Sequence, residues 1–413
     1  MKKILLATQK ISHTGTGVPS YNMELIRGMH HGYEISLLTE SGSECPAECA
    51  RCFSTEGHTI SDYQYCRRLT EAINAADYDC IISSASNFIP VLAPFLKAPI
   101  VSVSHFVNGL LAKKAAYNAG YKSRIIVLSD YAAEWMATRL RGKDAAKIET
   151  VYNFVDHSDL EPVDKTDRRG SLKIVCPSAN SMDKSIDVVQ KTLYRLLASD
   201  LDFRFYWIGR DTPLPADKYS LLGLKKLGDF FKKDPRLKIT GLLPLEEARR
   251  MLWDADIFLL PSRGEGCPMT LLEAMGGGCI PVVSDARHGS REIIERSGAG
   301  LIVAQGDDKR LYEAIRDIIL HRERYTDCYE KSRKYLEDHL SWEQWLSRME
   351  KIIGAAMGDT KKTEELTPGA FRRSLRGMLR IKRYERLREM ARNGWYRILM
   401  EGAYVKSKAG GYR

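Results

Sequence analysis

The sequence contains no run of about 18 apolar residues, the length that a helix needs to cross a bilayer. We therefore expect no membrane-spanning helix. A secretory signal pattern is also missing. The first residues, MKKILLATQ, hold two lysines and a short apolar run without a small-residue cleavage site. We interpret this stretch as a first β-strand.

Cysteine is present, but its pattern argues against a disulfide framework. The nine cysteines are odd in number and scattered along the chain, which is typical of a protein in a reducing cytoplasm. Four of them, Cys45, Cys49, Cys52 and Cys66, lie in or near an irregular segment. Their spacing would allow thiolates to surround zinc, but no matching Cys or His pair follows at finger-like spacing. We favour a reduced, variable loop over a metal site.

Length and composition indicate a globular protein with two domains. Of the 413 residues, 44% are hydrophobic, and a chain of this length usually forms more than one core. Short apolar runs at 80–83, 100–103 and 124–129 alternate with helical patterns. This alternation predicts parallel sheets covered by helices on both faces.

The most informative stretch covers residues 259–281, LLPSRGEGCPMTLLEAMGGGCIP. It predicts a strand end, a loop, a helix with Pro268 in its first turn and, after three glycines, a second strand. Such a loop lies where open α/β sheets bind ligands, and the N–H groups of a helix N-terminus suit phosphate or a sugar hydroxyl. Glu265 and Glu273 could accept from hydroxyls in one pocket. Taken alone, they are more simply a capping and a solvated glutamate.

The string EGCPMTLLEAMGGGCIPVV resembles the donor-site signature of glycosyltransferase family 4, whose members have the GT-B fold. The departure from the pattern is Cys267, where an aromatic residue is common. The resemblance covers residues 1 to about 357 and implies an α/β fold with two Rossmann-like domains facing an interdomain cleft. It places an N-terminal acceptor domain at 1–160, a C-terminal nucleotide-sugar donor domain at 171–340 and a helix crossing back at 341–357. Outside the resemblance, we expect residues 358–413 to form a basic helical C-terminal extension.

The resemblance also implies which residues bind the donor. Glu273 would accept from the ribose hydroxyls, and Glu265 would lie beside the donor sugar. The first loop resembles a family loop that faces the cleft, so Gly15 and Gly17 would line the diphosphate, although a plain βα turn explains these glycines equally well. Phosphate or sugar oxygens would be held by the loop and helix start, namely Gly266, Cys267, Pro268, Met269, Thr270 and Leu271.

Positive charge for the leaving diphosphate is expected from Lys184. This lysine matches the second part of a family pattern, GR…KG, whose Arg would fall near 179–180 and is absent here. A diphosphate leaving group needs positive charge as its bond breaks. Either Lys184 and helix N-termini supply enough positive charge for the diphosphate, or Arg210 or Arg263 substitutes for the missing arginine.

Other positions have a binding role in the family and a simpler explanation as well. His105 ends a strand where relatives often carry a histidine that lines the donor sugar, but a packed or capping histidine fits equally. Leu242 follows a strand whose backbone often meets the nucleobase. Lys113, Lys114 and Lys122 could meet an acidic acceptor or lipid head groups, or could form a solvated face.

We expect neither a metal nor any other cofactor. The triplet Asp254-Ala255-Asp256 superficially matches the Asp-x-Asp manganese motif of the other major glycosyltransferase fold, but here it precedes a strand inside the GT-B pattern. The nucleotide-sugar would be a substrate, and the resemblance implies transfer without an essential metal.

The basic character of the chain is confined to its last segment. Residues 361–413 hold fifteen Lys or Arg and five Asp or Glu, so this segment carries the whole net charge of +10. Arginines alternate with apolar residues, and Trp395 and Tyr396 lie near the end, a pattern typical of a helix on an anionic membrane surface. The alternatives are a helix packed on the body, an oligomer contact or a disordered tail. We expect no nucleic-acid partner, because no recognition motif accompanies the charge.

Together these features predict a retaining glycosyltransferase of the hexosyltransferase class, with Glu265, Lys184 and His105 as its catalytic group. It would move a sugar from a nucleotide-sugar, UDP-sugars being favoured over GDP-sugars, to a cell-surface glycan or glycolipid. We expect it in the cytoplasm or on the inner face of the membrane. Three alternatives stay open, namely a non-catalytic nucleotide-sugar-binding paralogue or scaffold, an epimerase or phosphorylase of the same fold, and a basic membrane or nucleic-acid adaptor.

Overall fold

The computed structural model describes residues 1–11, 17–107, 109–156, 165, 170–178, 182–209 and 234–409, and their side chains as far as residue 388. The predicted site residues Gly15 and Arg210, the segment at 179–180 and a helix expected at 217–233 lie outside the described residues.

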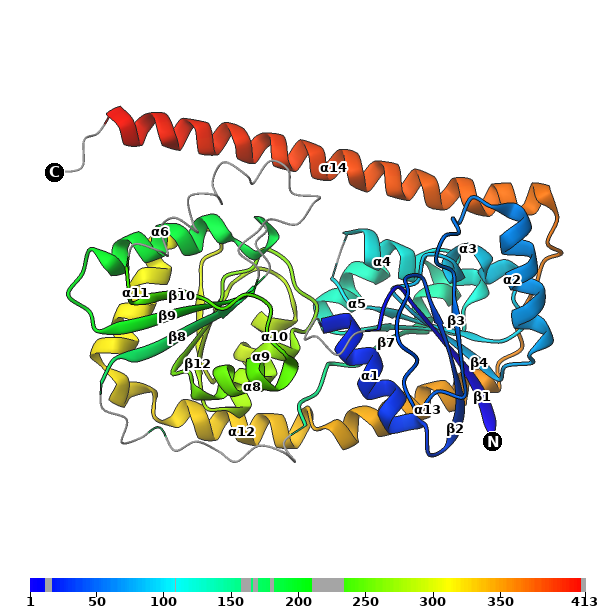
Figure 1. Cartoon of the computed structure of the whole chain (residues 1–413), viewed down its shortest axis with the longest axis horizontal. Coiled ribbons are helices and arrows are strands. Elements are labelled where there is room, and N and C mark those ends of the chain that lie inside the picture. The colour runs from blue at the N-terminus through cyan, green and yellow to red at the C-terminus, as the bar shows by residue number, and fades with distance from the viewer. Residues whose placement is uncertain are drawn as a thin grey trace.

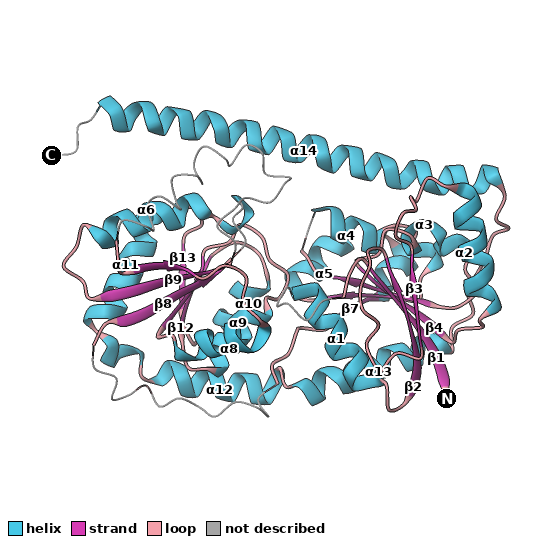
Figure 2. Cartoon of the chain, in the orientation of Figure 1, coloured by secondary structure: helices cyan, strands magenta, loops and turns pink. Residues whose placement is uncertain are grey.

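The first 150 residues build a parallel sheet in the strand order β3-β2-β1-β4-β5-β6-β7 (Figure 1; Figure 2). In its register, Ile4 of β1 lies level with Ile35 of β2 on one side and Cys80 of β4 on the other. The strands are β1 (Lys2–Thr8), β2 (Tyr33–Thr39), β3 (Arg51–Ser54), β4 (Cys80–Ser84), β5 (Ile100–Ser104), β6 (Arg124–Val127) and β7 (Ile148–Thr150).

A second parallel sheet follows, in the order β10-β9-β8-β11-β12-β13. Ile257 of β11 lies level with Ile280 of β12 and Ile174 of β8. The strands are β8 (Leu172–Pro177), β9 (Phe203–Ile208), β10 (Leu237–Ile239), β11 (Ile257–Leu260), β12 (Ile280–Ser284) and β13 (Leu301–Val303).

Helices cover both faces of each sheet, because β-strands that are buried on two sides need apolar partners on both. Those of the first domain are α1 (Gly17–Met29), α2 (Tyr63–Ala75), α3 (Ile89–Leu92), α4 (Gly109–Ala116) and α5 (Asp130–Ala137), with 3₁₀ turns η1 (Ala93–Phe95), η2 (Ala119–Tyr121) and η3 (Gly142–Lys147). Those of the second are η4 (Met182–Lys184), α6 (Ile186–Leu197), α8 (Leu245–Asp254), α9 (Met269–Gly276), α10 (Gly289–Ser297), α11 (Asp308–Leu320), η5 (Arg322–Tyr325) and α12 (Asp327–His339). Two further helices, α13 (Trp342–Met357) and α14 (Pro368–Ala409), end the chain.

The strand pleat divides the core of the first domain into two layers. Successive side chains of a strand point to opposite faces. Accordingly, Ile4 and Leu6 of β1 pack with α1 and α13, whereas Leu5 and Ala7 pack with α2, α3 and α14. The α1–α13 layer continues without a break into the α8–α9 layer of the second domain, for example through Leu260. This shared core holds the two domains together beneath the cleft.

The extension beyond residue 357 begins as part of the first domain. Phe371 and Met378 of α14 are buried against α3 and its neighbours. Ser374 links the same surfaces, because its Oγ donates to Val91 O at 2.7 Å and its carbonyl accepts from Tyr117 Oη at 2.6 Å. Of the alternatives for this segment, packing on the body holds for the first turns of α14. The rest of the helix continues as a straight rod away from α3 (Figure 1).

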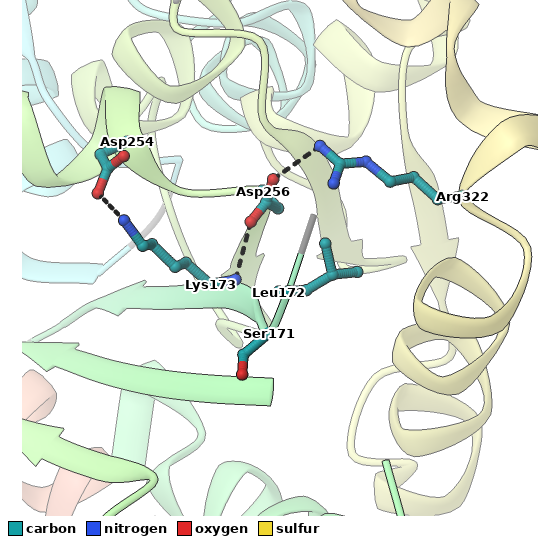
Figure 3. Close-up of a pocket in the computed structure, with 7 residues that line it drawn as sticks. Ser171, Leu172, Lys173, Asp254, Asp256 and Arg322 are labelled. Atoms are coloured by element: carbon teal, nitrogen blue, oxygen red, sulfur yellow. Dashed lines mark hydrogen bonds and ion pairs between the residues drawn. The ribbon is translucent and has the colours of Figure 1, made fainter. Parts of the chain in front are cut away.

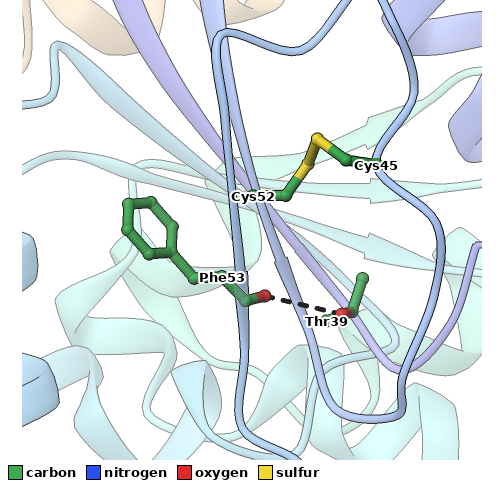
Figure 4. The surroundings of a disulfide bond; sticks show 4 residues. All are labelled: Thr39, Cys45, Cys52 and Phe53. Atoms are coloured by element: carbon green, nitrogen blue, oxygen red, sulfur yellow. Dashed lines mark hydrogen bonds between the residues drawn. A yellow bond between two sulfur atoms is a disulfide. The ribbon is translucent and has the colours of Figure 1, made fainter.

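The expectation of reduced cysteines in the 45–66 segment is wrong for two of them. Cys45 and Cys52 form a disulfide across a sequence separation of 7, with their Cα atoms 5.8 Å apart (Figure 4). The cause is an edge strand that the sequence pattern did not reveal. β3 pairs with β2, and this pairing turns the chain back on itself and brings Cys52 beside Cys45. Cys49 and Cys66 remain thiols.

Candidate functional site

The loop between β11 and α9 lies at the carboxyl edge of the second sheet. Its backbone is pinned by a hydrogen bond from Arg263 N to Asp183 O, 2.8 Å long. Pro268 is the N-cap of α9, one position before the first turn in which it was expected, and it offers no side-chain hydrogen bond to the helix. The first amides of α9 therefore have no side-chain cap and can meet a ligand.

Glu265 in this loop forms an ion pair with Lys184 in η4. The Glu265 side chain is 7% exposed and the Lys184 side chain 26%, so the lysine is the more exposed member of the pair. The two residues follow β11 and β8, which are neighbours at the point where the strand order reverses. Open α/β sheets bind their ligands at such switch points. The structure thus brings together two residues that are 81 positions apart.

Glu273, the predicted ribose acceptor, is buried in α9 and paired with a residue that the sequence analysis missed. Arg249 of α8 donates from Nε to Glu273 Oε1 at 3.1 Å. Burial raises the pKa of the Glu273 carboxyl, and the positive charge of Arg249 opposes that shift. Helical spacing on α8 could have placed Arg249 on the α9 side, but it could not have named its partner.

His105 follows β5 in the first domain and lies against the loop at Gly266. Its Nε2 is hydrogen-bonded to Ser84 Oγ at 2.8 Å, and its ring meets that of Tyr21 edge-on, with centroids 4.9 Å apart. Burial lowers the pKa of this imidazole to about 4, so the ring is neutral at pH 7. Because Nε2 is hydrogen-bonded to Ser84, Nδ1 is the ring nitrogen that a sugar hydroxyl could meet, as a donor or an acceptor according to the tautomer.

The backbone of the loop touches the first domain directly. A Cβ built on Gly266 would overlap the carbonyl oxygen of His105 and lie 2.9 Å from its carbonyl carbon. Asn153 Nδ2 donates to Cys267 O at 2.5 Å, and Gly289 N donates to Gly266 O at 2.9 Å. The Cys267 side chain itself is buried, which raises the pKa of its thiol to about 12. Position 267 is therefore occupied by an inert thiol in the core rather than by an aromatic ring.

Glu292 of α10 links the two domains through hydrogen bonds. Nothing in the sequence pattern had indicated this role. Its carboxylate accepts from the amide of Asp130, at 2.9 Å, and from that of Tyr131, both at the start of α5 in the other domain. Tyr152 donates to the same carboxylate. A negative charge at a helix N-terminus is stabilising, so this contact helps to hold α10 against α5 of the other domain.

His288 is a second buried histidine that the sequence analysis missed. Its Nε2 lies 3.2 Å from Ser284 Oγ, at the N-cap of α10. Burial lowers the pKa of His288, while the charge of Glu265 raises it and that of Lys184 lowers it again. His288 therefore lies close enough to interact electrostatically with both Lys184 and Glu265.

The remaining predicted residues lie around this centre with different surroundings. Arg263 makes a bidentate ion pair with Asp187, at 2.9 and 2.8 Å, which offsets the charge it could offer a diphosphate. Leu242 is 52% exposed between β10 and α8. Gly17 begins α1 and has open space where a Cβ would be.

Asp254 and Asp256 lie at the opposite, amino edge of the second sheet. They line a cavity of about 290 Å³ together with Lys173 and Arg322 (Figure 3). Asp254 forms an ion pair with Lys173, and Asp256 accepts from the Lys173 amide and from Arg322, both at 2.8 Å. These contacts give both carboxylates a structural role away from the cleft.

Within the described ranges, no group of three or more His, Cys, Asp or Glu is placed to hold a metal ion. Among the same residues, no helix has the length and apolar character needed to cross a membrane.

Two family models match the chain, one on each sheet. The family described as Glycosyltransferase Family 4 matches residues 15–159, and the family described as Glycosyl transferases group 1 matches residues 172–321. Together the matches cover more than two thirds of the chain.

Curated relatives match over a shorter region. The putative colanic acid biosynthesis glycosyltransferase WcaL of Escherichia coli K12 is 34% identical over 113 residues, which are 24% of this chain and 28% of that protein. The amylovoran biosynthesis glycosyltransferase AmsK of Erwinia amylovora is 43% identical over 81 residues, 18% of this chain and 20% of the relative. The aligned part thus spans less than a third of the length of these relatives.

Solved structures match over almost the whole chain. HepE from Anabaena superposes with a TM-score of 0.69 at 14% identity, covering 86% of this chain and 100% of that one. Sucrose-phosphate synthase from Thermosynechococcus elongatus gives 0.69 at 16% identity, with 86% and 99% covered. These similarities confirm the predicted fold, two Rossmann-like α/β domains in the GT-B arrangement.

Proposed function

Because this chain belongs to glycosyltransferase family 4, a family of transferase enzymes, we propose that it transfers a sugar from a nucleotide-sugar to a glycan or glycolipid acceptor in polysaccharide biosynthesis. The observation that carries the proposal is the pair formed by Lys184 and Glu265 at the switch point of the second sheet. Beside it, the N-terminus of α9 faces His105 of the other domain across the Gly266 contact. An ammonium, a carboxylate and helix amides are the groups that a sugar diphosphate needs.

UDP-sugars are the favoured donors. Structures of the same fold include HepE in complex with UDP and with UDP-glucose, and TarM of S. aureus in complex with UDP. The buried Glu273 in the middle of α9 would accept from the ribose hydroxyls, since its carboxylate has a second oxygen besides the one that Arg249 contacts. Leu242 would lie against the base.

The chemistry then follows from the charges. As the bond between the anomeric carbon and the diphosphate oxygen breaks, that oxygen keeps the electron pair, and Lys184 with the first amides of α9 would stabilise it. Glu265 and the neutral His105 would hold the sugar hydroxyls. The acceptor oxygen would attack on the face that the diphosphate leaves and pass its proton to the leaving phosphate. Configuration would be retained, and no metal would be needed.

A panel of UDP, GDP and ADP tests the donor site by calorimetry, with Lys184→Met and Lys173→Met as matched variants. Each lysine forms an ion pair with a carboxylate, but Lys184 lies at the carboxyl edge of the second sheet and Lys173 at its amino edge. We expect tight binding of UDP by the wild type and by Lys173→Met. Release of UDP from UDP-glucose, UDP-galactose or UDP-N-acetylglucosamine should fall by about a hundredfold or more in Lys184→Met, as for loss of one charge-stabilising donor. Equal release by Lys184→Met and wild type would contradict the mechanism.

A non-catalytic nucleotide-sugar-binding protein is the second candidate. Its support is that Lys184 is already engaged by Glu265 and that Arg263 is engaged by Asp187. UDP binding without UDP release from any sugar of the panel, with or without a glycan acceptor, would favour this candidate.

We further propose that the outer part of α14 contacts an anionic membrane surface. Beyond the buried Met378, the helix carries exposed Arg383, Arg386 and Arg388 together with exposed Leu387. Basic residues near such a surface contribute about 1 kcal/mol each. The helix would then hold the enzyme where a lipid-linked acceptor is presented.

Flotation with vesicles tests this contact. Changing the three arginines to Gln should weaken binding to phosphatidylglycerol vesicles by about a hundredfold. The matched control changes Lys331, Arg333 and Lys334 to Gln, because these are exposed cations on α12, on the other side of the molecule (Figure 1). Equal binding of the two triple variants, or equal binding to phosphatidylcholine, would overturn the proposal.

A further inference from the structure

A polar cluster lies at the carboxyl edge of the first sheet, outside the donor site. Glu40 follows β2, and its carboxylate accepts from Ser86 Oγ at 3.0 Å and from both the backbone and the side-chain N–H groups of Asn87, which follows β4. Asn87 Oδ1 in turn accepts from Lys114 Nζ on α4. Glu40 and Asn87 are half-buried, so the cluster is open to solvent on one side.

The position of this cluster in the fold is that of a ligand site. β1 has β2 on one side and β4 on the other, so the strand order reverses at β1. Glu40 and Asn87 reach over this switch point from its two sides. In the second domain, Lys184 and Glu265 also lie at the switch point, although they follow the adjacent strands β8 and β11. Because open α/β sheets bind ligands at the carboxyl edge of the switch point, the first sheet has its own binding position.

The ammonium of Lys114 has different partners from those of Lys122 and Lys361. Lys122 Nζ donates to the carbonyls of Lys114 and Ala115 at 3.2 and 2.7 Å, and Lys361 Nζ donates to two carbonyls after α3. Both of these ammonium groups thus meet the partial negative charge of helix C-termini. Lys114 is 4% exposed, and among the described residues the only hydrogen-bond acceptor of its ammonium is Asn87 Oδ1.

The charges around Lys114 favour an anion. No carboxylate oxygen of the described residues lies within 4.0 Å of its ammonium, whereas the neighbouring Lys113 forms an ion pair with Glu385 of α14. Burial and the charge of Lys382 on α14 together lower the pKa of Lys114 to about 8, and the charge of Glu40 opposes this shift. Most of the group is therefore still protonated at pH 7, and Lys382 adds a second positive charge to its surroundings. A buried charge without a close counter-ion is costly.

We propose that Lys114, with Asn87 and Glu40 as its frame and Lys382 of α14 beside it, binds an anionic group of the sugar acceptor. The group is a carboxylate of an acidic sugar or a phosphate of a lipid-linked or glycosyl phosphate acceptor. The proposal rests on the proposed function, because it assigns the acceptor to the domain that faces the donor site. In this proposal, the part of α14 that packs on α3 and α4 completes the acceptor site by supplying Lys382.

The test titrates the full-length protein with sodium glucuronate, inorganic phosphate and uncharged glucose at constant ionic strength, with and without saturating UDP. We expect one of the two anions to bind. Its affinity should fall by about tenfold or more in Lys114→Met, because a charge-assisted hydrogen bond is lost. Lys114→Arg should retain part of the affinity. Lys113→Met should bind like the wild type, since Lys113 is neutralised by Glu385. If only glucuronate binding depends on Lys114, the acceptor group is the carboxylate of an acidic sugar. If only phosphate binding depends on Lys114, the acceptor is phosphorylated.

Two results would overturn the proposal, namely no binding of either anion by the wild type, or unchanged anion binding in Lys114→Met. Should Lys114→Met fail to fold, Lys382→Gln removes the half-buried second cation from α14 and should still weaken anion binding by about threefold. The UDP titration in the same series separates the two hypotheses. Loss of UDP binding refutes the donor site, whereas the anion titration without UDP reports on Lys114 alone.

Discussion

The backbone carbonyl of His105 lies directly against the Cα of Gly266, and this contact joins the two domains at the donor site. A Cβ at position 266 would lie 2.9 Å from the His105 carbonyl carbon and would overlap its oxygen. Backbone atoms on both sides cannot move aside as a flexible side chain could. The glycine therefore sets how closely the His105 side of the cleft approaches Glu265.

Gly266→Ala should open the cleft and impair transfer. Even a displacement of about 1 Å can cost about a hundredfold in rate, because reacting groups lose their alignment. We expect a turnover reduced to that extent and a larger radius of gyration by small-angle scattering. Gly264→Ala is the matched control, since a Cβ there meets nothing within 4 Å. If both variants turn over donor alike, the contact does not control the site.

Variants of Arg249 and Glu273 should differ in which property they lose, the free energy of unfolding or the affinity for UDP. Arg249→Met leaves the buried Glu273 carboxylate without its partner, and we expect a loss of about 3 kcal/mol in the free energy of unfolding. Glu273→Gln should cost less stability but at least about tenfold in UDP affinity, because the amide has no negative charge and replaces one of the two acceptor oxygens, of which Arg249 already uses one, by an N–H donor.

Denaturant unfolding and UDP calorimetry on both single variants and the double variant check this expectation. The double variant should recover part of the stability lost in Arg249→Met, because no charge is left buried alone. UDP affinity that depends on Arg249 but not on Glu273 would refute the ribose role of the glutamate.

His105 predicts a stability change at mildly acidic pH. Its pKa is about 4 in the folded protein and about 6.5 when exposed. Between these values the unfolded chain binds the proton and the folded chain does not, so the contribution is fully present above pH 6.5 and is lost as the pH falls to 4. The difference is about 3 kcal/mol. The stability of the wild type should therefore fall more steeply over this window than that of His105→Asn, and parallel curves would show that His105 is not buried in neutral form.

The Cys45–Cys52 disulfide should stabilise the edge of the first sheet. Closing so short a loop restricts the unfolded chain by about 2 kcal/mol. A reductant should lower the unfolding free energy of the wild type by that amount and leave the Cys45→Ser/Cys52→Ser protein unaffected, with Cys49→Ser as the control that keeps the bond. A thiol titration of the denatured, unreduced protein should give seven groups. Nine would mean that the bond is absent.

Local pattern predicted most of the strands and helices, because each is specified by residues close together in sequence. The stretch from β11 to β12 shows this, since its apolar runs, loop residues and glycines follow one another in the chain. β3 was missed because it is a short, exposed edge strand whose pairing with β2, not its own pattern, makes it a strand. The helical character of the C-terminal extension was predicted, with packing on the body as one of the alternatives, but the pattern did not identify α3 and α4 as the elements it packs on.

The candidate site divides in the same way. The sequence by itself determined which loop carries Glu265 and which helix carries Glu273, since strand, glycine and helix signals are local. Only the tertiary structure decided that Lys184 meets Glu265, that Arg249 neutralises Glu273, that Glu292 caps a helix of the other domain and that Lys114 lacks a close counter-ion. These relationships join residues from different strands and domains. The energies of these contacts depend on burial and on interatomic distances, which are set only when the two sheets have folded and packed against each other.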